Sequence, residues 1–516
     1  MRWSKLMLTA GVPIVQSAVA DFGGGQQVLG GDDASSSSKF TCDLPPVLDP
    51  SADGLPAARD LFGDGKALLK QVERHSYLVR IPSISYDDNG EPGKDPRWNV
   101  FYEVHAALAY LYPNVHLPSK GTNPALRPLM LTAHQDVVPV ADESTWTYPP
   151  FSAHFDGRWL WGRGASDDKN SLTALMSALD TLLSNPAWVP QRSIVVALGF
   201  DEECSGRRGA GEIGKYLETN YGKHSMAIIL DEGGMGLDLL EGKTLYALPA
   251  VMEKGHVDIW LDLKINGGHS STPFPHTGIG IMSEIVVKLE SNPYDPKLIK
   301  DSPIHRHLEL VTVDRKTQYR LQTSQSVDYF IGGIKINAMP EKIRIGVNHR
   351  VAPQNSIPEV KGRILDLIKP IVKHYGLGVS AFKGEDNNPD DLLGEFAPAY
   401  DVDYNGTLTL SSTQPSQVAP VSPSSGDIWD VFSGTIQHSF AFEDGKVVPV
   451  GELMTGNTDT RHYLHLSKHV YRWTPTRKGG TQNAHTVDEA IDMQAHMEAL
   501  RFYYDLIRNF DAAEAY

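Results

Sequence analysis

The chain has 516 residues, of which 47 are lysine or arginine and 63 are aspartate or glutamate, so its formal net charge is −16. Charged residues make up 21% and hydrophobic residues 41% of the sequence, which is ordinary for a folded protein and excludes a disordered or fibrous chain. The acidic balance argues against a nucleic-acid-binding protein, which usually presents a basic face. The length is sufficient for two or three domains with a large buried core.

The first twenty residues have the form of a cleavable secretory signal. Arg2 and Lys5 precede an apolar run that ends in the small residues Ala18–Ala20. A membrane anchor is the alternative, but Pro13 and Gln16 interrupt a run that is already short for a bilayer. We therefore expect passage through the secretory pathway to a vacuole lumen or the extracellular space, with no stable membrane insertion after cleavage.

Three further features agree with a secretory route or leave it open. Residues 21–40 are rich in glycine and serine and are expected to be an unstructured leader. The two cysteines, Cys42 and Cys204, could pair in an oxidising compartment, but the sequence does not show that they come close enough. Asn405 begins an Asn-Gly-Thr triplet, which is a glycosylation acceptor.

Apolar periodicity predicts the first elements in chain order. Helical spacing indicates amphipathic helices over residues 66–78 and 171–183. Short continuous apolar runs predict three buried strands, at residues 129–132, 194–200 and 227–230. Buried strands that alternate with helices are typical of an α/β sheet covered on both faces.

The pattern changes after about residue 250. Residues 257–265 and 343–348 alternate apolar and polar side chains with period two, as half-exposed strands do. Helical patterns lie at 279–291 and 358–374. The Ser/Thr/Pro-rich segment 407–425 is expected to be a loop or linker, and residues 487–507 a terminal helix. We infer a smaller α+β domain, residues 251–375, inserted between two parts of a larger domain, residues 41–250 and 376–516.

Each predicted buried strand is followed at once by side chains that can bind a metal ion. These side chains are His134 and Asp136, then Glu202 and Glu203, then Asp231 and Glu232. Asp167 and Asp168 follow a Gly-rich turn at the start of the helix over 171–183. Since ligands bind outside the carboxyl ends of strands in open α/β sheets, we expect these groups to meet in one crevice.

Taken singly, such acidic residues usually lie in solvated turns or cap helices. Together they favour a metal centre, because so many carboxylates placed close together are costly without cations. Imidazole nitrogen with carboxylate oxygen suits zinc, with cobalt or manganese as alternatives.

Four motifs resemble those of the M20 metallopeptidases: LTAHQDVVPV, WGRGASDDKNSL, LGFDEECSG and ILDEGG, in this order. Within that family the chain is most similar to the carboxypeptidase S branch, and the resemblance extends from about Cys42 to the C-terminus. It implies an α/β, mixed-sheet, two-zinc exopeptidase catalytic domain with an inserted lid or dimerisation-type domain, and it allows a homodimer.

The resemblance implies five ligands for two zinc ions, with Asp167 as the bridging one: His134, Asp167, Glu203, Asp231 and His485. His485 lies in the segment GGTQNAHTVDEAI near the C-terminus. Some relatives have the fourth ligand one residue later, so Glu232 remains open as the alternative to Asp231.

By the same resemblance, Glu202 is the general base that takes a proton from water and delivers it to the leaving nitrogen. Asp136 corresponds to an acid that orients the ligand or the base. The Asp167–Asp168 peptide bond is cis in similar proteins.

The smaller domain carries further matches. His269, in GGHSS, resembles the histidine that stabilises the tetrahedral oxyanion from a partner subunit or across a closing cleft. Asn337 and Arg350 resemble substrate-contacting residues, and Arg350 could bind a substrate carboxylate. Arg461, in the segment GNTDTR, is a second candidate for that carboxylate. The alternatives are an ordinary turn at His269 and an exposed strand charge at Arg350.

The sequence therefore predicts an exopeptidase that removes a C-terminal residue from small peptides. An N-acyl amino-acid amidohydrolase is chemically close and is the alternative, because the motifs do not separate the two substrates. An inactive peptide-binding relative is disfavoured, since competent residues occupy every ligand position and the position of the base.

Overall fold

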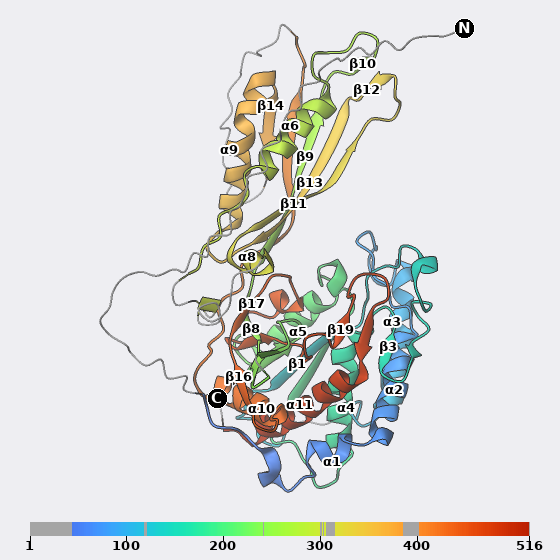
Figure 1. Ribbon diagram of the computed structural model, residues 1–516, viewed down its shortest axis with the longest axis vertical. Helices are drawn as coiled ribbons and strands as arrows, with labels where there is room; N and C mark the ends of the chain where they lie inside the picture. The colour runs from blue at the N-terminus through green and yellow to red at the C-terminus, as the bar shows by residue number, and fades with distance from the viewer. Residues whose placement is uncertain are drawn as a thin grey trace, which may run out of the picture. The chain divides into compact units, whose positions relative to one another are not determined.

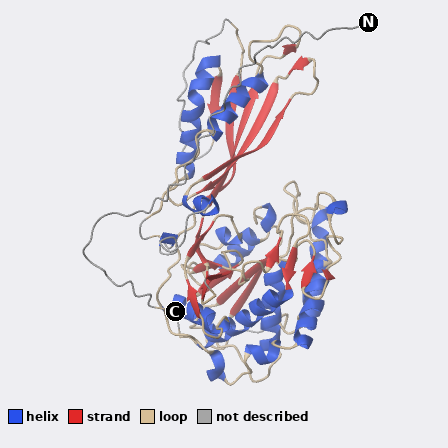
Figure 2. Cartoon of the chain, in the orientation of Figure 1, coloured by secondary structure: helices blue, strands red, loops and turns tan. Residues whose placement is uncertain are grey.

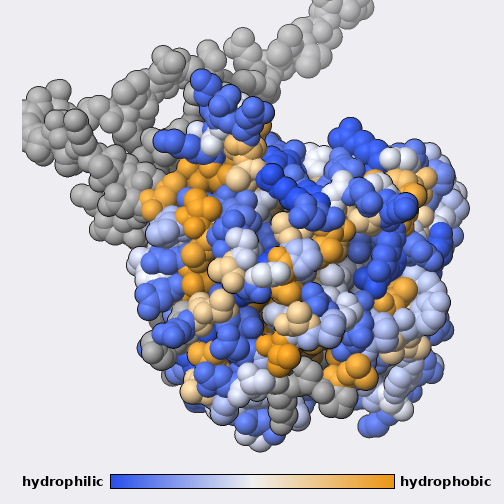
Figure 3. Space-filling model, turned by 90° about the horizontal axis from the view of Figure 1, so that it is seen from below, coloured by the Kyte–Doolittle hydropathy of each residue, from blue (hydrophilic) through white to orange (hydrophobic). Residues whose placement is uncertain are grey.

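The computed structural model describes residues 44–117, 121–240, 242–299, 302, 304–305, 315–384 and 402–514. The expected signal, the leader and Cys42 lie outside these ranges. No helix within them is long and apolar enough to span a bilayer. On the face shown in Figure 3, apolar residues are interspersed with hydrophilic ones.

The larger part of the fold is built on a six-stranded mixed sheet (Figures 1 and 2). In spatial order its strands are β17 (Glu452–Met454), β8 (Ala250–Glu253), β18 (Val470–Arg472), β5 (Ile228–Asp231), β1 (Leu129–His134) and β4 (Ile194–Gly199). β1 pairs in parallel with both β4 and β5. The three predicted buried strands are therefore neighbours in one sheet.

Helices cover both faces of this sheet, as the continuous apolar strands predicted. Leu129 and Leu131 of β1 lie in the core that also contains residues of α4 and α11, whereas Met130 lies in a second core with residues of α5. Successive side chains of a strand point to opposite faces, so one strand contributes to both cores. The helices of this part are α1 (Ala58–Phe62), α2 (Gly65–Val79), α3 (Val100–Leu111), α4 (Lys169–Leu183), α5 (Ala210–Tyr221), α10 (Asp427–Ser439) and α11 (Met493–Ala512).

The smaller part has a five-stranded sheet with helices α6 (Gly278–Glu290) and α9 (Ile357–Tyr375) packed in its core. Its strands, in spatial order, are β11 (Ser324–Gly332), β13 (Lys342–Val351), β9 (Gly255–Lys264), β15 (Thr407–Ser416) and β14 (Gly378–Ala381). Val257 and Ile259 of β9 are buried in this core, whereas Asp258 and Trp260 are only partly buried. The period-two alternation thus marks a strand with one covered face.

The remaining α-helix and β-strands are short. They are α8 (Arg315–Leu321), the strands β19 (Thr481–Gln482), β20 (Ala490–Asp492), β3 (Trp159–Trp161) and β2 (His154–Phe155) of one sheet, β16 (Lys446–Pro449), β7 (Thr244–Ala247) and β6 (Leu237–Leu240) of another, and the pair β10 (Gly268–His269) and β12 (Ala338–Met339).

Two sequence expectations are wrong. Residues 407–416 form β15, which pairs with both β9 and β14, rather than a linker. The five-stranded sheet thus includes residues up to Ser416, beyond the boundary at residue 375 that the sequence suggested. The physical reason is that Leu408 and Leu410 are buried while Thr407 and Thr409 are exposed, and Thr favours strands despite its frequency in loops. The terminal helix begins only at Met493, because β20 precedes it.

Buried histidines are expected to make the fold sensitive to acid. Burial lowers the pKa of His349 on β13, and that of His75 on α2, to about 4. Since the unfolded chain has a histidine pKa near 6.5, it binds protons below that pH while the folded chain does not. Stability is therefore expected to fall between about pH 6.5 and 4, by on the order of 3 kcal/mol for each of these histidines.

The test is His349→Phe, which keeps a ring beside Tyr294. The unfolding temperature of this variant should fall less between pH 7 and 5 than that of the wild type. An equal fall in both chains would contradict the assignment.

Candidate metal centre

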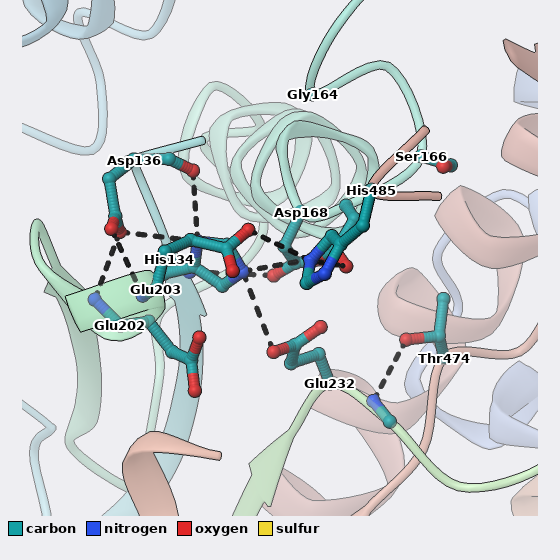
Figure 4. Close-up of polar contacts among 12 residues, drawn as sticks. His134, Asp136, Gly164, Ser166, Asp168, Glu202, Glu203, Glu232, Thr474 and His485 are labelled. Carbon is teal, nitrogen blue, oxygen red and sulfur yellow. Dashed lines mark hydrogen bonds and ion pairs between the residues drawn. The ribbon is translucent and has the colours of Figure 1, made fainter. Parts of the chain in front are cut away.

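Three neighbouring strands end at one edge of the large sheet, and their last residues and following turns bring the expected acids together (Figure 4). His134 ends β1, and Glu202 and Glu203 lie in a 3-10 turn that begins three residues after the end of β4. Glu232 follows β5. The sheet topology thus gathers side chains that are far apart in the chain.

Two donor groups form there and share one carboxylate. In the first, His134 Nε2 lies 3.1 Å from Asp167 Oδ1 and 3.5 Å from Glu232 Oε1. In the second, His485 Nε2 lies 3.1 Å from Asp167 Oδ2 and 3.1 Å from Glu203 Oε1. Each group has donor atoms close enough together to hold a metal ion. Asp167 faces both groups, one through each oxygen.

The structure brings Glu232, not Asp231, into the first group, whereas the sequence favoured Asp231 and left Glu232 open. Asp231 is the last residue of β5, and its Oδ1 accepts the N–H of Glu232 at 2.9 Å. Neighbouring side chains at a strand end point in different directions, so only one of the two acids can face His134. Glu232, which the sequence left open as the alternative, is the acid that lies beside His134.

Asp136 connects the first group to the turn after β4. Its carboxylate, which is fully buried, accepts the N–H groups of Glu202 and Glu203, each at 3.1 Å, and the hydroxyl of Ser85 at 2.6 Å. His134 Nδ1 lies 3.0 Å from the backbone oxygen of Asp136. A histidine held at Nδ1 in this way directs Nε2 toward the other donors, as in many metal sites.

The turn before α4 supplies the shared donor. The peptide bond between Asp167 and Asp168 is cis, as the resemblance implied. Asp168 is buried, and its Oδ2 accepts the N–H of His134 at 3.4 Å.

The electrostatics of the cluster fit a pair of divalent cations. Burial raises the pKa of Glu203 to about 7, which disfavours its charged form. Burial would lower the pKa of His134, but the surrounding carboxylates, Glu232 foremost, raise it well above its usual value. Hydrogen bonds to Asp167 and Glu203 raise the pKa of His485 to about 10. Cations bound among these donors would favour ionised carboxylates and neutral imidazoles instead, and one imidazole with two carboxylates per group suits zinc.

Glu202 belongs to neither donor group and is free for other chemistry. Its side chain is 11% exposed, and its Oε1 lies 3.9 Å from Arg461 Nη2. Burial, first among several causes, raises the pKa of Glu202 well above its usual value. A carboxyl group with a raised pKa beside a metal site can both accept and return a proton.

Arg350 and Arg461 lie near each other although they come from different parts of the fold. Burial and the neighbouring Arg461 guanidinium lower the pKa of Arg350. Arg350 Nη1 donates to Asn457 Oδ1 at 2.7 Å, and Asn457 Nδ2 donates to the backbone oxygen of Lys254 at 2.8 Å. Asn457 was missed from the sequence, although it lies in the same GNTDTR segment as Arg461.

His269 and Asn337 adjoin each other but not the donor groups. Ser270 donates its N–H to the backbone oxygen of Asn337 at 3.3 Å, and His269 is exposed, with Nδ1 2.8 Å from Ser271 Oγ. Within the described ranges, no hydrogen bond or ion pair joins either residue to the two donor groups.

Known proteins resemble the chain over most of its length. Residues 130–509 match the model of peptidase family M20/M25/M40. Carboxypeptidase S of Saccharomyces cerevisiae is 35% identical over 498 residues, which cover 85% of this chain and 84% of that protein. An N-fatty-acyl-amino acid synthase/hydrolase of Homo sapiens is 32% identical over 427 residues, 76% of each chain.

Solved structures share the fold. Human carnosine dipeptidase 1 has a TM-score of 0.61 at 12% identity, covering 89% of this chain and 100% of that one. An M20 family metallo-carboxypeptidase of Sulfolobus solfataricus has a TM-score of 0.59 at 16% identity, covering 86% and 99%.

The roles of Asp231, which ends β5, and Glu232, which follows it, can be distinguished by the effect of each acid on metal binding. Glu232→Gln removes an anionic donor, so we expect it to weaken Zn²⁺ binding about 100-fold or more, whereas Asp231→Asn should cost less than about 10-fold. The measurement is competition with a chromophoric chelator. The reverse order of affinities would make Asp231 the ligand.

Proposed function

The chain belongs to peptidase family M20/M25/M40 and is a hydrolase, and on this premise we propose that it is a zinc-dependent exopeptidase that releases the C-terminal amino acid of small peptides. The observation that carries the proposal is the pair of donor groups that share Asp167. The similarity to carboxypeptidase S supports the peptide substrate. The similarity to an N-fatty-acyl-amino acid synthase/hydrolase keeps an N-acyl amino-acid amidohydrolase as the second candidate.

Two Zn²⁺ ions, or Co²⁺ or Mn²⁺ in their place, would be held by the first and second donor groups: His134, Asp167 and Glu232, and Asp167, Glu203 and His485. When bound, they would supply Lewis-acid polarisation of the scissile carbonyl and acidify water in the site.

Glu202 takes a proton from the attacking water and delivers it to the amide nitrogen as the C–N bond breaks. Asp136 accepts the backbone N–H of Glu202, so it fixes the position of the base relative to the donor groups. Arg350 and Arg461 are candidates to bind the substrate carboxylate, because guanidinium groups pair with carboxylates through two parallel hydrogen bonds.

His269 would donate to the oxyanion, and Asn337 beside it would contact the substrate. Both lie on the smaller part of the fold, so either closure of this part or a partner subunit has to bring them to the scissile bond. The expected secretory location remains a prediction from the N-terminal sequence.

The reaction can be tested with blocked dipeptides and N-fatty-acyl amino acids offered side by side. We expect faster turnover of the dipeptides, loss of activity with a chelator, and recovery with Zn²⁺. Glu202→Gln should lower kcat by about 10²- to 10⁴-fold while Zn²⁺ stays bound, because a proton carrier is lost and no donor is removed.

Glu212→Gln is the matched control, since Glu212 on α5 pairs only with exposed Lys215 in the described contacts. Full activity of the Glu202→Gln chain would remove Glu202 as the base. Faster turnover of the N-acyl substrates would favour the second candidate function.

We also propose a homodimer formed through the smaller part. β11 is the edge strand of the five-stranded sheet, and it leaves Phe330 and Ile331 exposed. Ile334 and Ile336, between β11 and β12, are fully exposed. Exposed apolar side chains at a sheet edge are typical of an association surface. Ser270 Oγ donates to the backbone oxygen of Ile336 at 3.5 Å, so this surface adjoins the segment of His269.

Sedimentation of the full chain tests the dimer. We expect the mass of two chains for the wild type and of one chain for the Ile334→Asp/Ile336→Asp double variant, because buried charge opposes association. Tyr110→Asp, at an exposed site on α3, should leave the dimer intact. A wild type that sediments as one chain would contradict the proposal.

A further inference from the structure

Glu489 lies between the two segments that carry His485 and the shared donor Asp167. It comes four residues after His485 and directly precedes β20, which pairs with β3. Its backbone oxygen accepts the N–H of Gly162 at 2.8 Å, one residue beyond the end of β3. This pairing places the Glu489 side chain against the turn that leads from β3 to Asp167.

The Glu489 carboxylate accepts five hydrogen bonds from that turn, and its side chain is 1% exposed. Oε2 accepts from Arg163 Nη1 at 2.7 Å and from the N–H of Gly164 at 3.1 Å. Oε1 accepts from the N–H and the hydroxyl of Ser166, at 2.9 and 3.0 Å, and from the N–H of Asp167 at 3.1 Å. Both oxygens are therefore engaged, and a buried guanidinium compensates the charge.

The pattern of donors separates this contact from an ordinary buried ion pair. An ion pair that only stabilised the fold would need Arg163 alone, and such pairs add little net stability. Here three backbone N–H groups between Gly164 and Asp167 converge on the same carboxylate, so it holds the path of the main chain. The last of them belongs to the residue whose side chain serves both donor groups.

We propose that Glu489 is a positioning residue that holds Asp167 between His134 and His485 and so sets the affinity of the site for its pair of divalent cations. This inference rests on the proposed function, since it requires the two donor groups to bind metal ions. Residues that orient metal ligands typically change the affinity 10- to 100-fold when they are replaced.

Glu489→Gln is the informative substitution because both oxygens of the carboxylate accept hydrogen bonds. Each of its oxygens accepts N–H groups, so the amide –NH₂ of glutamine must face an N–H donor in either orientation. The variant therefore loses either the contacts to Arg163 and Gly164 or those to the backbone N–H groups of Ser166 and Asp167, with almost no change of shape.

Asp180→Asn is the matched control. Asp180 on α4 is also a buried carboxylate, with Oδ2 2.9 Å from Arg74 Nη2 and Oδ1 accepting from both nitrogens of Asn114. No described contact joins Asp180 to the donor groups. It reproduces the loss of a buried ion pair without touching the turn at Asp167.

The experiment measures the Zn²⁺ dissociation constant of the full chain by chelator competition, together with the unfolding temperature of the metal-free protein. We expect Glu489→Gln to bind Zn²⁺ about 10- to 100-fold more weakly than the wild type. Asp180→Asn should keep the wild-type affinity while its metal-free unfolding temperature falls.

Wild-type Zn²⁺ affinity in the Glu489→Gln chain would overturn the inference, and so would an equal loss in Asp180→Asn, which would report general destabilisation. If Glu489→Gln does not fold, Ser166→Ala decides, because it removes only one contact to Oε1; it should bind Zn²⁺ measurably more weakly, and an unchanged affinity would overturn the inference. A wild type that binds no Zn²⁺ would instead overturn the proposed function itself.

Discussion

One partly buried carboxylate, that of Asp167, lies between two imidazoles, and the turn that carries it is held in place by many contacts of the surrounding structure. Buried acids repel one another and lose their hydration, so such a cluster is stable only with positive charge among them. His134 and His485 face the two oxygens of Asp167 at 3.1 Å, and divalent cations would supply the remaining charge. The cis peptide after Asp167 and the hydrogen bonds to the turn before it belong to the same arrangement.

The two parts of the fold meet at the proposed substrate side of this centre. β8 ends and β9 begins on either side of Lys254, so the chain passes there from one sheet to the other. The backbone oxygen of Lys254 binds Asn457, which in turn binds Arg350. Arg461, four residues after Asn457, reaches toward Glu202. A single short segment thus links the crossing point between the sheets, a candidate carboxylate-binding residue and the proposed base.

Local patterning predicted the elements that carry a strong periodic signal. The apolar run at 129–132 lies in β1, and the alternation at 257–265 largely coincides with β9. A strand buried on both faces has a continuous apolar sequence, whereas a strand buried on one face alternates apolar and polar residues. The segment 407–416 shows where such reasoning fails. Threonine favours strands, but serine and proline are typical of loops, and only the pairing with β9 and β14 decides between the two.

The sequence by itself determined which kinds of side chain meet at the centre, since strand ends of a parallel sheet converge and the ordered motifs mark them. Only the tertiary structure decided which of two adjacent acids faces His134, because Asp231 and Glu232 both offer a carboxylate and differ in the direction in which their side chains point at the strand end. Glu489 was beyond sequence reasoning for the same reason. Its role depends on the pairing of β20 with β3, which brings together residues more than 300 positions apart.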